Sequence, residues 1–89
     1  MKRNKLPNNT QQYIQEQKKQ NLKDKDKVII IRTAESYKNG WYNNWTPKMT
    51  KFVGQTGTVI TRLEDYGVCV EFPGPHIAYF PYFVLRKVQ

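Results

Sequence analysis

The sequence predicts a mainly β fold, in which five short strands form a small antiparallel barrel preceded by a short N-terminal α-helix. Three observations support this prediction. Apolar runs of strand length begin at Lys27 and recur to the end of the chain, separated by glycine and proline turns. The 89 residues allow one domain with a small core. Aromatic residues make up 13% of the chain, which suits a barrel filled by a few bulky side chains.

Residues 1–26 are predicted to form a basic arm, rich in Asn, Gln and Lys. The spacing of Asn9 and Gln12 is compatible with a capping box, so a short helix is expected over about residues 10–21. A lone helix of this length is marginal in water. We therefore expect it to form only where Tyr13 and Ile14 dock on the domain or on a partner.

Residues 27–89 are predicted to form the barrel, and its first strand is KVIIIR, residues 27–32. Both faces of this strand are apolar, so the N-terminal helix is expected to cover the face that carries Ile29 and Ile31. A long aromatic loop follows at residues 33–53. The second strand is expected in GQTGTVITRL, where Gly54 and Gly57 permit a positive φ and a close approach of two backbones.

The last three strands are separated by tight turns. In VCVEF, Val68, Val70 and Phe72 alternate onto one face, as a half-buried strand requires. The fourth strand, IAYF, ends at Pro81 because proline lacks a ladder donor. One helical turn at YFVL and a final short strand at RKV complete the predicted order.

Two local motifs in this order resemble SH3-like barrels. FVGQTGTVI, residues 52–60, resembles the G-x-x-G-x-V turn and strand of KOW-type domains, which occur in ribosomal proteins and transcription elongation factors. YFPYFV, residues 79–84, resembles the proline, helical turn and last strand that close peptide-binding SH3 domains. The resemblance covers about residues 26–88 and implies a five-stranded SH3-like antiparallel barrel.

The chain departs from these families in its long loop. This loop is longer than the compact KOW motif, and it carries only Glu35 where peptide-binding SH3 domains use several acidic residues. Binding of proline-rich peptides is therefore not expected. The abundance of Lys, Asn and Ile in so short a chain is typical of a protein encoded by a bacteriophage or a low-GC bacterium.

The chain is strongly basic, with fifteen Lys and Arg against seven Asp and Glu and a formal net charge of +8. Residues 1–27 hold eight basic and three acidic side chains, so the arm is the more cationic part. This charge favours an anionic partner, such as nucleic acid, a membrane surface or an acidic protein face. A charge excess that only keeps a small protein soluble stays an alternative.

The expected location is the cytoplasm, or the host cytoplasm for a phage-encoded protein. The single cysteine, Cys69, cannot form an internal disulfide, which indicates a reducing compartment. No apolar stretch follows the basic start, and no run approaches the roughly 18 apolar residues of a spanning helix. A membrane partner is therefore not expected.

The aromatic loop SYKNGWYNNWTPKM, residues 36–49, is the first candidate site. In one interpretation, Trp41 or Trp45 folds over the open end of the barrel and joins the core. In the other, Tyr42 and the edge of one Trp form a platform that stacks on bases or anchors a protein partner. Lysines flank the rings, as nucleic-acid surfaces require, because phosphates attract cations and bases need a flat face. They are Lys38, Lys48 and Lys51.

The basic arm is the second candidate site, and a merely solvated arm is its alternative. Arg32 and Arg62 lie on strands and are better placed as fixed contacts, unless their stems only cover apolar surface. The predicted binding set combines both sites: Lys2, Arg3, Lys5, Lys18, Lys19, Arg32, Lys38, Trp41, Tyr42, Trp45, Lys48, Lys51 and Arg62.

No catalytic arrangement stands out in the sequence. Glu64 and Asp65 are adjacent in a turn rather than opposed across a cleft, and His76 stands alone in a Pro-Gly-Pro turn. Cys69 lies between two valines without a basic neighbour, so it is expected to be inert. The sequence therefore predicts no enzyme, no cofactor, no metal and no small-molecule substrate.

The predicted function is a non-enzymatic binding module that holds RNA or DNA through phosphate contacts and aromatic stacking. The alternative is a small phage-type protein that docks on an acidic host protein and modulates it, as an inhibitor or an adaptor.

Overall fold

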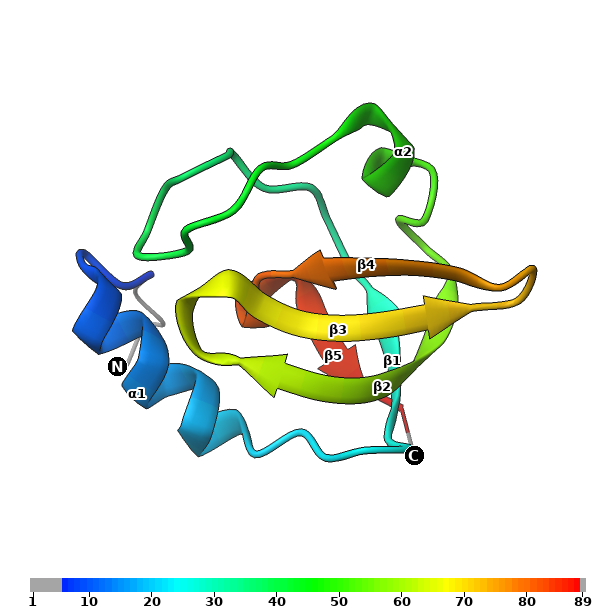
Figure 1. Ribbon diagram of the computed structural model, residues 1–89, viewed down its shortest axis with the longest axis horizontal. Coiled ribbons are helices and arrows are strands. Elements are labelled where there is room, and N and C mark those ends of the chain that lie inside the picture. The colour runs from blue at the N-terminus through cyan, green and yellow to red at the C-terminus, as the bar shows by residue number, and fades with distance from the viewer. Residues whose placement is uncertain (1–5, 89) are drawn as a thin grey trace, which may run out of the picture.

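The computed structural model describes residues 6–88, which form one five-stranded antiparallel sheet with a helix and a long loop packed on it (Figure 1). The mainly β prediction, with five antiparallel strands after a short helix, is confirmed at this level. The elements in chain order are α1 Thr10–Gln20, β1 Lys27–Ile30, α2 Pro47–Thr50, β2 Thr56–Leu63, the 3-10 turn η1 Glu64–Tyr66, β3 Gly67–Phe72, β4 His76–Phe80, the 3-10 turn η2 Tyr82–Val84 and β5 Leu85–Lys87.

The sheet has the strand order β4-β3-β2-β1-β5. Strands β1, β2 and β3 each pair with the next strand along the chain. Strand β5 returns to pair with β1, through Val28 and Lys87 at one end and Ile30 and Leu85 at the other. This return places the last strand beside the first. Strands β4 and β5 are the two edges of the sheet, and no ladder joins them within residues 6–88.

The core lies on the concave side of the sheet, where alternate residues of each strand point inward. Val68, Val70 and Phe72 are buried together on one face, as predicted. Gly57 is required by close packing, because a Cβ built there would lie 2.5 Å from Val70 Cγ1. Gly54 has φ +90°, which confirms the predicted positive φ at this turn.

Helix α1 begins and ends at asparagine caps. The side chain of Asn9 accepts a hydrogen bond from Gln12 N at 2.9 Å, and Gln12 Oε1 accepts one from Asn8 N at 2.7 Å. The helix stops at Asn21, which adopts the left-handed conformation with φ 56°. The predicted helix at about residues 10–21 is confirmed, with Asn9 as its N-cap. The second bond differs from a capping box, because Gln12 accepts from Asn8 N and not from the N-cap Asn9.

Tyr13 docks this helix on the domain. Its side chain is fully buried, and its hydroxyl donates to Gln17 Oε1 at 2.6 Å and accepts from Tyr82 N at 3.2 Å. Gln20 Nε2 donates to the carbonyls of Tyr82 and Leu85, both at 3.2 Å. Burial of this aromatic face and these hydrogen bonds stabilise a helix that would be marginal alone.

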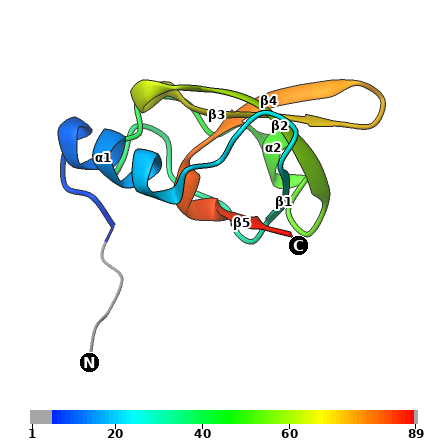
Figure 2. The ribbon, with the colours of Figure 1, turned by 90° about the horizontal axis from the view of Figure 1, so that it is seen from below.

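The helix does not cover the second face of β1, so that prediction is wrong. Helix α1 packs between η1 and η2 at one end of the sheet, and it lies far from β1 in both views (Figures 1 and 2). Ile31 is consequently 42% exposed. Strand β1 also ends at Ile30, before Arg32, although Ile31 N still donates to Val84 O, which lies opposite it in the β1–β5 register, at 2.8 Å.

Replacing Tyr13 with Phe is expected to lower the free energy of unfolding by about 1–3 kcal/mol, because Gln17 Oε1 and Tyr82 N lose a partner in a buried place. Urea denaturation followed by circular dichroism measures this. The matched control is Tyr37→Phe at a tyrosine that is 60% exposed, which should change stability by less than about 0.5 kcal/mol. Equal losses in the two variants would contradict the docking role of the Tyr13 hydroxyl.

Stability is expected to fall in alkaline solution. Burial raises the pKa of Tyr13 above its ordinary value and raises the pKa of Tyr82 to about 12. The unfolded tyrosines lose their protons at about pH 10, before the folded ones do, so the stabilisation is complete below that pH and declines above it. Urea midpoints should be level up to about pH 9 and then drop, with a shallower drop in the Tyr13→Phe variant. An equally steep drop in that variant would contradict the assignment to Tyr13.

Candidate nucleic-acid interface

The long loop between β1 and β2 is fixed to the sheet by Trp41. The indole is 1% exposed, and its Nε1 donates to Tyr66 O at 2.8 Å. Tyr42 N, the next backbone amide, donates to Asp65 O at 2.7 Å. Trp45 packs edge-on against Trp41 and Phe80, with ring centroids 6.4 and 5.7 Å apart. These contacts pin the middle of the loop over η1 and the core.

The turn residues of the loop also contact the start of α1. Asn39 and Gly40 both have positive φ, which their residue types tolerate at low cost. Asn39 Nδ2 donates to Pro7 O at 3.2 Å, and a Cβ built on Gly40 would lie 2.3 Å from Asn9 O. The loop backbone therefore approaches the helix so closely that only glycine fits at position 40.

As expected from the sequence, some aromatic rings of the loop are buried in the core and others are exposed. Trp41 caps the core, whereas Tyr42 is 67% exposed. Tyr37 is 60% exposed and meets Tyr42 edge to face, with centroids 5.3 Å apart. Trp45 is half-buried, with its Nε1 donating to Thr50 Oγ1 at 2.9 Å. Trp41 is too deeply buried to touch a partner, so its place in the predicted binding set is corrected to a structural one.

The single-turn helix α2 directs two lysines outward. Thr46 caps it by accepting from Met49 N, and Pro47 occupies its first turn. Met49 is buried beneath the turn, while Lys48 and Lys51 are exposed above it. The sequence analysis treated this segment as loop. The Thr-Pro pair is the signal that indicated a helix start.

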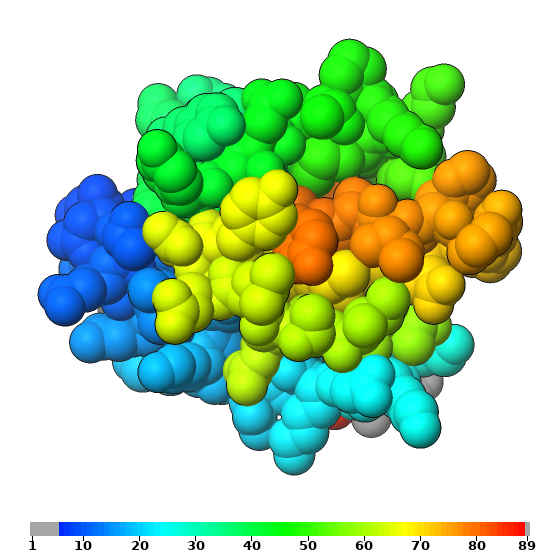
Figure 3. Space-filling model, viewed as in Figure 1, coloured from blue at the N-terminus to red at the C-terminus, as the bar shows by residue number. Residues whose placement is uncertain are grey.

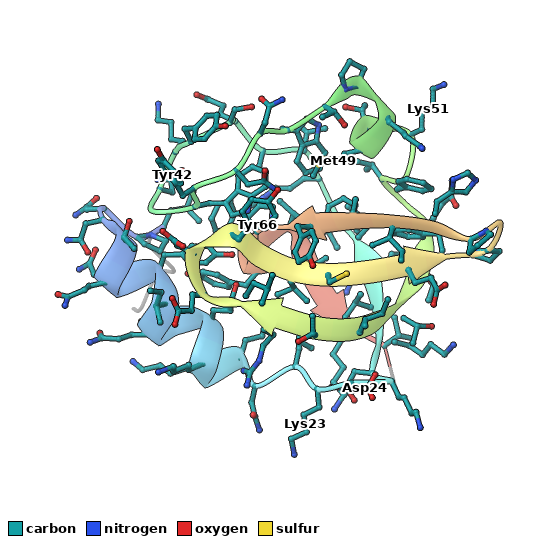
Figure 4. All side chains as sticks on the ribbon, viewed as in Figure 1. Lys23, Asp24, Tyr42, Met49, Lys51 and Tyr66 are labelled. Carbon is teal, nitrogen blue, oxygen red and sulfur yellow. The ribbon has the colours of Figure 1, made fainter. Side chains whose placement is uncertain are left out.

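A hollow of about 280 Å³ lies between the long loop and β4. Figure 3 shows the loop directly above the surface of β3 and β4 on this face of the molecule. Tyr66 from η1 and Tyr79 from β4 line it, and their rings meet edge to face at 4.8 Å. Met49 from α2 and Tyr66 from η1, both labelled in Figure 4, are among its lining residues. The lining residues are Asn43, Asn44, Thr46, Lys48, Met49, Phe52, Tyr66, Ile77, Ala78 and Tyr79.

A second hollow, of about 460 Å³, adjoins the first through Lys48 and Phe52. Its other lining residues are Pro47, Lys51 and His76. We call the two hollows together the tyrosine–lysine groove. None of the described residues that line this groove is Asp or Glu. The groove therefore combines flat rings, amides and cations without a carboxylate that would repel an anion.

Cys69 lies opposite Tyr79 in the β3–β4 register and does not line the groove. It is buried, and burial raises the pKa of its thiol, so it stays protonated near neutral pH. Burial likewise raises the pKa of Tyr79 above its ordinary value. Both groups are neutral at physiological pH. The thiol therefore has the low reactivity that the sequence analysis expected of it.

The other predicted cations do not join this groove. Lys18 and Lys19 lie on α1, on the opposite side of the sheet from α2 in Figure 1, and Lys19 Nζ is 3.4 Å from Glu16 Oε2. Lys38 Nζ is 3.4 Å from Glu35 Oε1. Arg32 is exposed beyond the end of β1. Lys2, Arg3 and Lys5 lie outside the described residues.

Arg62 extends beneath α1 rather than toward the groove. With Lys18 it lines a small cavity of about 120 Å³. Its Nη1 is buried and has no hydrogen-bond partner among the described residues. Among the described residues, Lys48 and Lys51 are the predicted cations that line the groove. The described lysines and arginines of the predicted binding set therefore lie on separate parts of the structure.

Six groove residues lie outside both the expected loop site and the predicted binding set: Phe52, Tyr66, His76, Ile77, Ala78 and Tyr79. Tyr66 was assigned to a turn, and His76 to a turn although it begins β4. The alternation of Ile77 and Tyr79 in the predicted fourth strand does place them on one face, which is a usable signal. The exposed ring of Tyr66 joins that face only through the pairing of β3 with β4.

The described residues contain neither a cluster of metal ligands nor a membrane-spanning helix. No group of three or more His, Cys, Asp or Glu side chains is placed to hold a metal ion. No helix in the described part of the chain is long and apolar enough to cross a membrane.

Replacing Trp41 with Phe is expected to lower the free energy of unfolding by about 1–3 kcal/mol, because Tyr66 O loses its donor in a buried contact. Urea denaturation measures the change. The comparison variant is Tyr42→Ala, at the neighbouring exposed ring, which should stay within about 0.5 kcal/mol of the parent protein. A larger loss for Tyr42→Ala than for Trp41→Phe would show that the ring roles are reversed.

No protein-family model, no curated protein and no solved structure matches this chain.

Proposed function

We propose that this protein is a non-enzymatic module that binds RNA or DNA in the tyrosine–lysine groove. The observation that supports this most directly is the groove lining, which joins Tyr66 and Tyr79 to Lys48 and Lys51 without a carboxylate. Nucleic acid needs both features in one place, because bases stack on aromatic rings and phosphates attract cations. The net charge of +8 favours the same partner at longer range.

We also propose that the sheet is an SH3-like barrel of KOW type. The strand order supports this, because β5 lies beside β1 and each of the first three strands lies beside the next. Helix α1 and the long loop cover the core where the sheet is open. A small barrel of this kind has little room for a deep cleft, and a surface groove is the site that such a fold offers.

The expected salt dependence follows from the number of groove cations. Lys48 and Lys51 would neutralise two phosphates, and each phosphate contributes about −0.7 to the slope of log affinity against log salt for a single strand. The slope is then about −1.4, or roughly a sevenfold loss of affinity between about 50 and 200 mM salt. Participation of the basic arm would make the slope several times steeper.

The second candidate function is docking on an acidic protein, such as a host protein of a phage. The observation that favours it is the exposure of aliphatic side chains on the same face, with Ile77 55% and Leu63 47% exposed. Exposed aliphatic groups contribute to protein interfaces and little to phosphate contacts. Such an interface would depend weakly on salt and would form equally well after nuclease treatment of a lysate.

The groove is tested with a fluorescently labelled oligouridylate of about 12 nucleotides. Lys48→Gln and Lys51→Gln should each reduce the salt slope by about 0.7, because each removes one phosphate contact. Lys19→Gln, an exposed lysine on the far helix, is the matched control and should leave the slope unchanged. Fluorescence anisotropy at several salt concentrations measures all four proteins. Equal effects of Lys19→Gln and Lys48→Gln, or no binding at about 50 mM salt, would refute the proposal.

A further inference from the structure

The edge of strand β4 runs along the floor of the tyrosine–lysine groove. Three consecutive residues, Ile77, Ala78 and Tyr79, all line the first hollow. Side chains alternate between the two faces of a strand, so three in a row can share a hollow only if it lies along the strand's edge. Strand β4 pairs with β3 on its other side, and this outer edge faces the long loop (Figure 1).

One residue on this edge has a free backbone donor and a free backbone acceptor. Asn43 Nδ2 donates to Tyr79 O at 3.4 Å, so the backbone of Tyr79 faces the groove. Alternate residues of a strand direct their N–H and C=O to the same side, so Ile77 faces the groove as well. No described residue hydrogen-bonds to the N–H or C=O of Ile77 across this edge.

On the outer edge of β4, only Ile77 has both a backbone N–H and a C=O that are not already used within residues 6–88. Pro75, two residues before Ile77, has no N–H, and the carbonyl of Tyr79, two residues after, is already bonded to Asn43. An added peptide strand needs several alternate residues to form a ladder. The edge therefore suits a ligand that makes one pair of adjacent hydrogen bonds.

We propose that the N–H and C=O of Ile77 bind the Watson–Crick edge of an unpaired base. This inference rests on the nucleic-acid function proposed above. Each of the four RNA bases carries an acceptor beside a donor on that edge, so one backbone pair complements all of them. The rings of Tyr66 and Tyr79 line the same hollow and are available to the base. The groove then selects single strands over duplexes, whose Watson–Crick edges are occupied, without preferring one base.

The first test changes the probe and leaves the protein intact. Oligouridylate is compared with the same oligonucleotide built from 3-methyluridine, in which a methyl group replaces the Watson–Crick donor. The methylated probe should bind about three- to tenfold more weakly, as expected for the loss of hydrogen bonds to the backbone. Oligouridylate, oligocytidylate and oligoadenylate should bind alike, and a matched duplex should bind more weakly than any of them. Equal binding of the two uridine probes would overturn the inference.

The second test changes the protein at one backbone group. Ile77→Pro removes the N–H at an edge position where no ladder bond is lost, and Ile77→Ala removes the side chain but keeps the N–H. The Pro variant should bind oligouridylate about three- to tenfold more weakly than the Ala variant, because it lacks the N–H that donates to the base acceptor. It should still prefer oligouridylate to the methylated probe, because the C=O that accepts from the base is retained. Equal binding of oligouridylate by the two variants would contradict the proposed hydrogen bond between the Ile77 N–H and the base. Thermal unfolding checks that both variants fold, and if the Pro variant does not, the probe comparison decides.

The two proposals fail in different ways. If the wild-type protein binds none of the single strands, the nucleic-acid function itself is refuted. If it binds the uridine and methyluridine probes equally well, the nucleic-acid function stands and only the base contact at Ile77 is refuted.

Discussion

Three consecutive carbonyl groups in η1 hold together the two segments that pack around the sheet. Glu64 O accepts from Gln17 Nε2 of α1 at 2.8 Å, and Asp65 O accepts from Tyr42 N of the long loop at 2.7 Å. Tyr66 O accepts from the Trp41 indole at 2.8 Å. A three-residue turn thus joins the helix, the loop and the sheet. Loss of this turn would free both segments together.

The same attachment explains how a small domain can present exposed rings in a fixed place. Trp41 is buried and the half-buried Trp45 packs against it, so the backbone between them has little freedom. Tyr42 and its neighbour Tyr37 project from this fixed loop. A loop that is ordered before binding loses little conformational entropy on contact with a partner. The long loop therefore contributes to both the core and the groove wall, because some of its side chains point inward and others point outward.

Much of the fold could be predicted from sequence because its determinants are local. Apolar alternation located the strands, and the Asn9 cap located α1. The position of α1 could not be predicted, because it depends on Tyr13 reaching Tyr82 across 69 residues of sequence.

The candidate site was predicted in part. The loop supplied Lys48 from sequence alone, but its partners come from η1 and β4, and only strand pairing shows that these meet. Net charge gave no information on which cations lie together.

The open sheet leaves two edges that neighbouring molecules could extend into a fibre. Strand β5 is only three residues long and carries the exposed Arg86 and Lys87, whose like charges oppose stacking of copies. On β4, Pro75 and the Asn43 side chain restrict the available backbone to one residue. Both edges are thus unsuited to continuous cross-β growth, and the chain resists amyloid-like aggregation without having to close its sheet.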